Sequence, residues 1–257
     1  MMGQKIILLA VDCDFTNMIY HALKESYPNI EVIIEEPVSK GKLIRGRIRK
    51  LGLFKVFGQL VFQVGVYPFL KRRAQARIKA ILNKAGMSSE SIPPGIVKKI
   101  GSANSNESID LIKAKAPDLI IINGTRILSE KFVKTFQGKI MNIHAGITPT
   151  YRGVHGGYWA LINNDPENCG TTVHFVDSGI DTGSILAQDK VEVEQEDNFA
   201  TYPYLQFVKG INLLLSSMDK FFEGNLKVIS AESAKSALWY HPTFIEYFYY
   251  WKTKKVK

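Results

Sequence analysis

The chain has 257 residues, which is enough for one large domain or for one domain with a modest extension. Hydrophobic residues make up 46% of it and charged residues 22%, a balance that excludes wholesale disorder. The formal net charge of +9 favours anionic partners, such as phosphates, nucleotides, nucleic acid or an acidic membrane surface, without choosing among them.

Three features of the chain indicate its compartment. The two cysteines, Cys13 and Cys169, are too few for a disulfide scaffold and lack the paired spacing of a zinc site, so we expect free thiols. The N-terminus passes straight into an apolar run without a cleavage site, which argues against a signal peptide. No stretch approaches the length of a membrane-spanning helix. We therefore expect a cytoplasmic protein.

The first elements indicate the fold class. Lys5 to Val11 is a continuous apolar run typical of a strand buried in a parallel sheet. Thr16 to Ser26 has helical periodicity, and Ile30 to Ile34 returns to β-branched residues. Strand, helix, strand predicts an α/β, Rossmann-like fold: an open, mostly parallel twisted sheet with helices on both faces, followed by a short helical and aromatic C-terminal extension.

Residues 40–84 are rich in Arg and Lys around an apolar middle. We expect two helices here, broken near Gly65 and Pro68. They are either amphipathic helices packed on the sheet with a solvated basic face, or a surface that recruits anionic lipid or a phosphorylated substrate.

The remaining elements alternate in the same way. Residues 86–105 are rich in Ser, Pro and Gly and are expected to form a loop. Strands are predicted over 118–123, 139–144, 171–176 and 185–193, and helices over 107–115, 130–136, 156–163 and 198–218. We expect a catalytic domain over residues 1–197, including the basic segment 40–84, and a C-terminal helix and aromatic tail over 198–257.

Candidate chemistry gathers around the predicted strand 139–144. Asn142 and His144 lie two residues apart, so their side chains share one face at the end of the strand, where open α/β folds bind ligands. An amide can donate to a carbonyl oxygen that becomes negative, and an imidazole can hold or move a proton. Asp181, in a Gly- and Thr-containing loop, could orient the imidazole or accept a proton.

Each of these residues also has a structural interpretation. Asn142 could close a turn, His144 could be a satisfied core imidazole, and Asp181 could be a turn aspartate. The pattern alone leaves both interpretations open.

Three motifs carry a family resemblance. They are NGTRILSEKFV (Asn123 to Val133), NIHAGITPTYRG (Asn142 to Gly153) and GTTVHFVDSGIDTGSIL (Gly170 to Leu186). In this order and spacing the chain resembles the folate-dependent formyltransferase family, most closely the sugar N-formyltransferases. The family also includes glycinamide ribonucleotide formyltransferase and methionyl-tRNA formyltransferase.

The resemblance implies roles for particular residues. The family's catalytic Asn, His and Asp fall on Asn142, His144 and Asp181, and His174 matches a supporting histidine behind the site. The implied formyl donor is 10-formyltetrahydrofolate, and no metal is implied. The donor would be held by two segments, Arg126, Ile127 and Leu128, and Asp177, Ser178, Gly179 and Ile180. A substrate amine would attack the formyl carbon while Asn142 and protonated His144 hold the developing oxyanion.

The acceptor is inferred from departures from the family. Glycinamide ribonucleotide enzymes cradle a phosphate in a glycine-rich loop after the first strand, whereas Val11 to Thr16 here contain no glycine and two aspartates. Methionyl-tRNA enzymes continue into a β-barrel, and the residues after 197 have the wrong pattern for one. A nucleotide-linked amino sugar of surface polysaccharide biosynthesis is the remaining acceptor. A phosphoribosylglycinamide or methionyl-tRNA enzyme, or a catalytically silent folate- or nucleotide-binding relative, stays an alternative.

This interpretation predicts substrate contacts and partners. Aromatic groups can stack on a base, and basic groups can pair with a diphosphate. The candidate contacts are Tyr151, Arg152, His155, Tyr158, Trp239 and Tyr240. Packing or a dimer interface is the alternative role of the tail aromatics. We expect a homodimer, no nucleic-acid partner, and at most weak association with anionic membranes.

Overall fold

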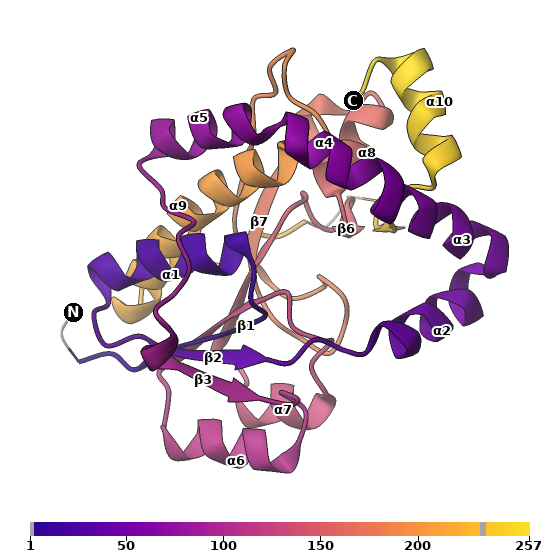
Figure 1. Cartoon of the computed structure of the whole chain (residues 1–257). Helices are drawn as coiled ribbons and strands as arrows, with labels where there is room; N and C mark the ends of the chain where they lie inside the picture. The colour runs from indigo at the N-terminus through magenta and orange to yellow at the C-terminus, as the bar shows by residue number, and fades with distance from the viewer. Residues whose placement is uncertain (1–2, 232–234) are drawn as a thin grey trace.

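The computed structural model describes residues 3–231 and 235–257 (Figure 1). Residues 1–2 of the predicted catalytic domain and 232–234 of the predicted tail lie outside the described residues. A seven-stranded sheet with the order β3-β2-β1-β4-β5-β7-β8 forms the centre of the molecule. Its strands are β1 (Ile6–Ala10), β2 (Glu31–Glu35), β3 (Val97–Ile100), β4 (Leu119–Asn123), β5 (Ile140–His144), β7 (Gly170–Phe175) and β8 (Ile185–Lys190).

The strands from β3 to β5 pair in parallel, and β7 and β8 join them antiparallel. The mostly parallel, Rossmann-like sheet predicted from the sequence is therefore confirmed. The central strand β1 is apolar throughout because both of its faces are covered. Leu8 belongs to the core on one face, and Ile7 and Leu9 belong to the core on the other.

Helices cover both faces of the sheet, as predicted (Figure 1). On one face, α1 (Asp14–Ser26), α5 (Gln75–Ala85) and α9 (Tyr202–Phe222) share a core with Leu8. On the other face, α6 (Asn106–Ala114) and α7 (Glu130–Thr135) pack over Ile7 and Leu9. Ser105 and Ser129 cap α6 and α7, since each side chain accepts a hydrogen bond from the first turn.

The basic segment differs from its prediction. It forms α2 (Lys40–Leu51), α3 (Leu53–Val61), a π-helical turn over Phe62–Val66, α4 (Tyr67–Arg73) and α5. The chain breaks at Gly52, where φ is +83°, and at Ala74, and it continues through Gly65 and Pro68. The wider π turn and the place of Pro68 in the first turn of α4 let the helix pass the proline.

As a result, Leu53–Arg73 is one helix of 21 residues, long enough and apolar enough to cross a membrane by length and composition. The expectation that no stretch has this length was wrong. One face of this helix nevertheless packs on the protein, because Val56 and Phe62 are buried.

Two short strand pairings were missed. The expected loop 86–105 contains a 3-10 turn (Pro94–Ile96) and the edge strand β3, whose two lysines are exposed. β6 (Arg152–Gly153) pairs in parallel with β9 (Leu238–Trp239) and joins the active-site loop to the C-terminal region. This second pairing connects segments far apart in the sequence, which no local pattern reveals.

The C-terminal region shares cores with the rest of the chain. Ile211, Leu214 and Met218 of α9 are fully buried in the core that α9 shares with the sheet. A third, aromatic cluster joins α8 (Gly156–Ile162) to α10 (Phe244–Lys254) and to Phe62 of the π-helical turn. A short 3-10 turn (Pro166–Asn168) follows α8.

Candidate active site

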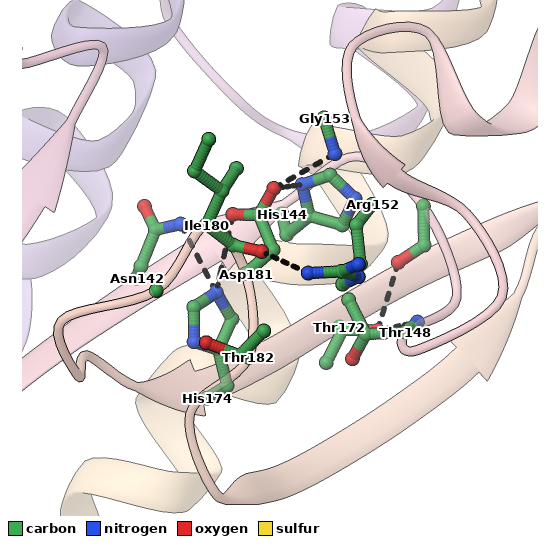
Figure 2. Close-up of polar contacts among 12 residues, drawn as sticks. Asn142, His144, Thr148, Arg152, Gly153, Thr172, His174, Ile180, Asp181 and Thr182 are labelled. Atoms are coloured by element: carbon green, nitrogen blue, oxygen red, sulfur yellow. Dashed lines mark hydrogen bonds and ion pairs between the residues drawn. The ribbon is translucent and has the colours of Figure 1, made fainter. Parts of the chain in front are cut away.

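The chemical side chains predicted from the sequence meet where β5 lies beside β7. Asn142 is paired with His174 across these strands, and His144 with Thr172. Asp181, on the loop between β7 and β8, reaches back over them (Figure 2). The structure thus brings Asn142, His144, His174 and Asp181 into one cluster. Both histidines face the Asp181 carboxylate, and the Asn142 amide contacts His174.

His144 is held between two acceptors. Its Nε2 lies 2.7 Å from the backbone oxygen of Tyr151, which can only accept, so Nε2 carries a proton and donates. Its Nδ1 faces Asp181 Oδ2 at 3.4 Å. A lone pair on Nδ1 would point at a carboxylate, whereas an N–H would donate to it. A ring with a proton on each nitrogen would donate to both of these acceptors.

His174 orients the Asn142 amide. Nδ1 of His174 donates to the Phe175 backbone oxygen over 2.7 Å, which leaves Nε2 as an acceptor for the Asn142 amide nitrogen at 3.2 Å. Burial lowers the pKa of His174, and the nearby His144 lowers it further, so the ring stays neutral and keeps accepting. Among the described residues the second N–H of Asn142 has no partner and is available to a ligand.

The loop of Asp181 is built to place its carboxylate. Asp181 adopts φ = +50°, a left-handed conformation that Asp tolerates better than most residues. Its Oδ2 accepts the Gly153 backbone N–H over 2.9 Å, and its Oδ1 lies 3.7 Å from His174 Nε2. At the base of the loop, Asp177 Oδ1 accepts from the Gly179 N–H at 2.9 Å and from the Thr182 hydroxyl at 2.7 Å.

A cavity of about 190 Å³ opens beside this cluster. Asn142, His174 and Asp181 lie in its wall together with both segments expected to hold the formyl donor. Its other lining residues are Ile122, Gly124, Thr125, Arg126, Ile127, Leu128, Val176, Asp177, Gly179 and Ile180. Of the predicted donor contacts only Ser178, which is exposed, is absent from this wall.

Glu35 supports this cavity and was not anticipated from the sequence. The side chain is buried at the end of β2, accepts the Ala103 N–H at 2.6 Å and the Arg126 N–H at 3.0 Å, and pairs with the Arg126 guanidinium. The Arg126 side chain is therefore committed to Glu35, and its role in the cavity wall is to hold the loop. A carboxylate closing an otherwise apolar strand was the signal available in the sequence.

Two predicted substrate contacts are corrected. Tyr151 and Tyr158 are only 2% and 1% exposed, inside the aromatic cluster. The Tyr151 hydroxyl donates to Asp165 at 2.9 Å, and its ring stacks on Trp239. Neither side chain faces a cleft, because each fills the core between α8 and the C-terminal segment. Tyr151 serves the site through its backbone oxygen, which fixes His144.

The other predicted contacts lie at the rim of that cluster. Arg152 donates to the Ile180 backbone oxygen at 3.1 Å, and its Nε is a buried donor without a partner among the described residues. The indole N–H of Trp239 donates to the Thr150 oxygen at 3.1 Å. The ring of Tyr240 lies under the Lys50 ammonium, 5.3 Å from its centroid.

His155 forms a pair that the sequence did not reveal. Its Nε2 lies 2.8 Å from Nδ1 of His241, so one ring must donate and the other accept. Burial lowers the pKa of His155 well below its ordinary value, and burial together with Arg47 lowers that of His241 to about 4. Both rings are therefore neutral at pH 7, and His155 packs on Phe199.

No group of three or more His, Cys, Asp or Glu side chains that could hold a metal ion occurs within residues 3–231 and 235–257. The cluster consists of an amide donor, an imidazole and a carboxylate beside a partly enclosed cavity, an arrangement suited to acyl transfer.

Comparison with known proteins gives this geometry a family context. The family model described as Formyl transferase matches residues 70–204, more than half of the chain. Methionyl-tRNA formyltransferase from Clostridium acetobutylicum is 28% identical over 158 residues, covering 61% of this chain and 48% of that protein. Phosphoribosylglycinamide formyltransferase from Escherichia coli is 41% identical over 97 residues, covering 37% of this chain and 45% of that protein. The chain thus spans less than half the length of these relatives.

Solved structures show the same fold at lower identity. A sugar N-formyltransferase from a Shewanella species has a TM-score of 0.55 at 16% identity, covering 90% of this chain and 75% of that one. A phosphoribosylglycinamide formyltransferase from Anaplasma phagocytophilum has a TM-score of 0.56 at 18%, covering 91% and 98%. An N-formyltransferase from Helicobacter canadensis has a TM-score of 0.55 at 16%, covering 92% and 70%.

Proposed function

The chain belongs to the formyl transferase family, and on this premise we propose that it transfers a formyl group from 10-formyltetrahydrofolate to the amine of a nucleotide-linked amino sugar. The observation that carries the chemical part is the cluster of Asn142, His144 and Asp181 beside the cavity that both expected donor-binding segments line. We assign the catalytic roles to these three residues.

The cavity suits part of a folate. At about 190 Å³ it is smaller than the roughly 300 Å³ at which pockets for whole drug-sized ligands begin, so it would enclose one ring system and leave the rest outside. The Helicobacter canadensis neighbour was crystallised with folinic acid. Ile127, Leu128 and Ile180 would provide the apolar part of the wall, and the donor supplies a formyl carbon open to attack by an amine.

The residues around that carbon would stabilise charge and move a proton. The free Asn142 N–H would donate to the formyl oxygen as it becomes negative, and the cationic His144 would add an opposing charge nearby. Asp181 would keep His144 charged and, being partly open to the cavity, would accept the proton that the attacking amine loses. A water would relay that proton to the folate nitrogen as the bond between this nitrogen and the formyl carbon breaks, and tetrahydrofolate would leave. His174 and Gly153 would serve as positioning groups.

The turn between β1 and α1 is poorly suited to bind the phosphate group of a ribonucleotide substrate. Asp14 begins α1, where a helix N-terminus would otherwise attract an anion. Its carboxylate accepts from Lys71 at 2.9 Å and from the Tyr204 hydroxyl. Burial alone would raise the pKa of Asp14, but these hydrogen bonds hold it below its ordinary value, so the group is negative and repels phosphate.

Groups on the loop after β5, on α2 and in the C-terminal segment would match a sugar nucleotide. Arg152 and Lys50 are cationic, and Trp239 and Tyr240 are aromatic and partly exposed. Guanidinium groups pair with diphosphates, and aromatic rings stack on bases. The Helicobacter canadensis neighbour was solved with dTDP-3-aminofucose, an acceptor of this class.

Several further predictions belong to this proposal. We place the activity in the cytoplasm and assign the product to surface polysaccharide biosynthesis. A homodimer through the C-terminal region stays a prediction, as does the division into a catalytic region over residues 1–197 and a C-terminal helix and tail.

The acceptor is tested by the release of tetrahydrofolate from 10-formyltetrahydrofolate, followed by absorbance, with a panel of amino-sugar nucleotides. Glycinamide ribonucleotide and methionyl-tRNA are included as competing acceptors. We expect release with at least one amino-sugar nucleotide and a formamide product of the corresponding mass.

Other outcomes of this assay would support other functions. Turnover with glycinamide ribonucleotide or methionyl-tRNA alone would replace the sugar by that acceptor. Binding of folate without release for any acceptor would indicate a catalytically silent relative and contradict the proposal.

A further inference from the structure

The long helix of the basic segment presents an apolar stripe to solvent. Phe54, Phe57, Val61, Val64 and Pro68 recur at alternating spacings of three and four residues, so they share one side of the helix. Phe54 is 90% exposed, Phe57 63% and Val64 76%. Solvated apolar side chains are ordinary one at a time, but a continuous stripe of them marks an interaction surface.

The neighbouring helices also expose apolar side chains. Leu43 of α2 and Leu53 of α3 are exposed next to it in the chain. α10 lies beside α3 (Figure 1), with Lys55 3.8 Å from Glu246, and it exposes further apolar side chains, including Trp251. We call the exposed apolar residues of α2, α3, the π-helical turn and α4 the arm surface: Leu43, Leu53, Phe54, Phe57, Val64 and Phe69.

The arm surface lies in a strongly cationic environment. Residues 40–84 carry 13 of the 33 Lys and Arg residues of the chain and none of its 24 Asp and Glu residues, so the rest of the chain is acidic on balance. Lys71 and Arg77 are used in ion pairs within the fold. Lys42, Arg45 and Arg49 of α2 are exposed and have no ion-pair partner in the part of the chain that the structure describes.

The same helix cannot cross a membrane in this fold. Its opposite side is locked to the body, where Phe62 packs on Phe199 and Tyr247, and Gln59 donates to the His241 backbone oxygen at 2.6 Å. A helix held in this way can lie only along a surface. Apolar side chains facing outward, with Lys and Arg around them, are typical of helices that rest in the interface of an anionic bilayer.

The combination of charge and apolar exposure selects one partner. A second copy seated on the arm surface would bring two cationic segments together, which like-charge repulsion opposes. Nucleic acid would suit the lysines and arginines, but it offers no apolar phase for Leu53, Phe57 and Val64. An anionic lipid surface satisfies both parts, because headgroups pair with the cations and acyl chains receive the apolar side chains.

We propose that the arm surface docks the protein on anionic membranes as a peripheral protein, with the helix Leu53–Arg73 lying in the plane of the bilayer. Binding does not require the formyl-transfer chemistry and can be measured without substrate.

The test is cosedimentation of the full chain with vesicles of phosphatidylcholine alone and of equal parts phosphatidylcholine and phosphatidylglycerol, at low and high salt. We expect binding to the anionic vesicles that weakens with salt. Phe54→Ser with Phe57→Ser should reduce partitioning by roughly tenfold or more, and Arg45→Glu with Arg49→Glu should abolish the preference for anionic lipid. Both pairs of changes are at exposed positions and should leave the circular dichroism spectrum and Tm unchanged.

A matched control distinguishes binding through the arm surface from non-specific binding through any exposed apolar side chain. Val228→Ser removes an apolar side chain that is 59% exposed outside the arm surface, and it should bind vesicles like the parent. Absence of binding to anionic vesicles at low salt, or equal binding to both compositions, would overturn the proposal. A dimer that forms without lipid and that Phe54→Ser with Phe57→Ser dissociates would also overturn it. So would vesicle binding that tRNA displaces and that the same Phe variant retains.

Discussion

His144 has a hydrogen-bond acceptor on each side of its ring. Its Nε2 donates to the Tyr151 carbonyl oxygen, and its Nδ1 faces the Asp181 carboxylate. On the adjacent strand, His174 donates to a carbonyl oxygen through Nδ1 and accepts from the Asn142 amide through Nε2. The hydrogen bonds thus give the two imidazoles of one cluster different roles.

The turn after β5 depends on a residue without a side chain. A Cβ at Gly146 would lie 2.4 Å from the Tyr151 backbone oxygen and 2.7 Å from His144 Nε2, the two atoms of the hydrogen bond that fixes the imidazole. Gly146→Ala should therefore destabilise the fold by about 1–3 kcal/mol and displace His144. We expect formyl transfer to fall more than a hundredfold, about the contribution of a well-placed proton-transfer group.

The matched control for this change is Gly41→Ala. Gly41 is exposed in α2, and a Cβ there would meet nothing within 4 Å. Urea unfolding should show it to be neutral or slightly stabilising, because alanine favours helix. Equal activity of Gly146→Ala and the parent would contradict the assigned role of the turn.

Individual site residues differed in how far the sequence predicted them. The chemical groups Asn142, His144 and Asp181 were found because alternation in a strand and the family motifs both pointed to them. Tyr151 and Tyr158 were misjudged because adjacency in sequence to the active loop says nothing about which way a ring points. His241 and Glu35 were missed because their partners lie far away in the chain.

At the scale of elements, α5 is joined to the loop before α9 by a buried ion pair. The Arg77 guanidinium donates to both oxygens of Asp197 over 2.9 Å, and Asp197 is buried. Asp197 also accepts the Glu194 N–H at 2.8 Å, so the pair fixes the path of the chain after β8. A basic segment expected to present either a solvated basic face or a surface for anionic ligands therefore also contains structural cations.

Removing Arg77 should destabilise the fold, because it leaves the Asp197 carboxylate charged and buried without a cationic partner. Arg77→Ala is expected to lower the free energy of unfolding by about 3–5 kcal/mol, measured by urea denaturation with an unchanged slope. Lys79→Ala, at an exposed position on the same helix, is the control and should change stability by less than about 0.5 kcal/mol. A similar loss in both variants would show that Asp197 does not need its partner.

Periodicity identified the central strands and the flanking helices because each buries a continuous apolar set. It failed in the basic segment, where Gly65 and Pro68 look like breaks but are absorbed by a π turn. It also failed at β3, a short edge strand with exposed lysines, and at the β6–β9 pairing. In these places tertiary contacts, which have no local signature, decide the structure.

The stability of the whole molecule should depend on pH through its neutral histidines. The folded chain lowers the pKa of His241 to about 4 and those of His155 and His174 below their ordinary values. Below about pH 6.5 the unfolded chain binds protons at these histidines, whereas the folded chain does not until a lower pH. The contribution of the neutral rings to the free energy of unfolding is therefore complete above about pH 6.5 and decreases as the pH falls towards about 4.

We therefore expect Tm to decrease between pH 7 and pH 5, with the paired histidines contributing on the order of 1 kcal/mol. In His241→Gln, scanning calorimetry should show a smaller decrease over the same interval, because one of the resisted protonations is gone. An identical pH dependence in both proteins would contradict the assignment of neutral, buried rings.

At the same scale, a formyl transferase fold carries a long basic helical segment between β2 and β3, and the family match begins only at residue 70. The proposed catalytic cluster lies where β5 pairs with β7, and the arm surface lies on helices that pack on the C-terminal segment. Catalysis and membrane docking can therefore be tested by independent variants.

The central claim, that Asp181 acts with His144 and Asn142 in formyl transfer, is tested most directly by the kinetics of Asp181→Asn. With the best acceptor of the panel, kcat for tetrahydrofolate release should fall by about 10²–10⁴-fold. The neutral amide of the variant cannot stabilise a protonated His144, and it cannot accept a proton from the attacking amine. KM for the acceptor should change little, and the Tm should show a folded protein. A kcat within a few-fold of the parent would contradict the account.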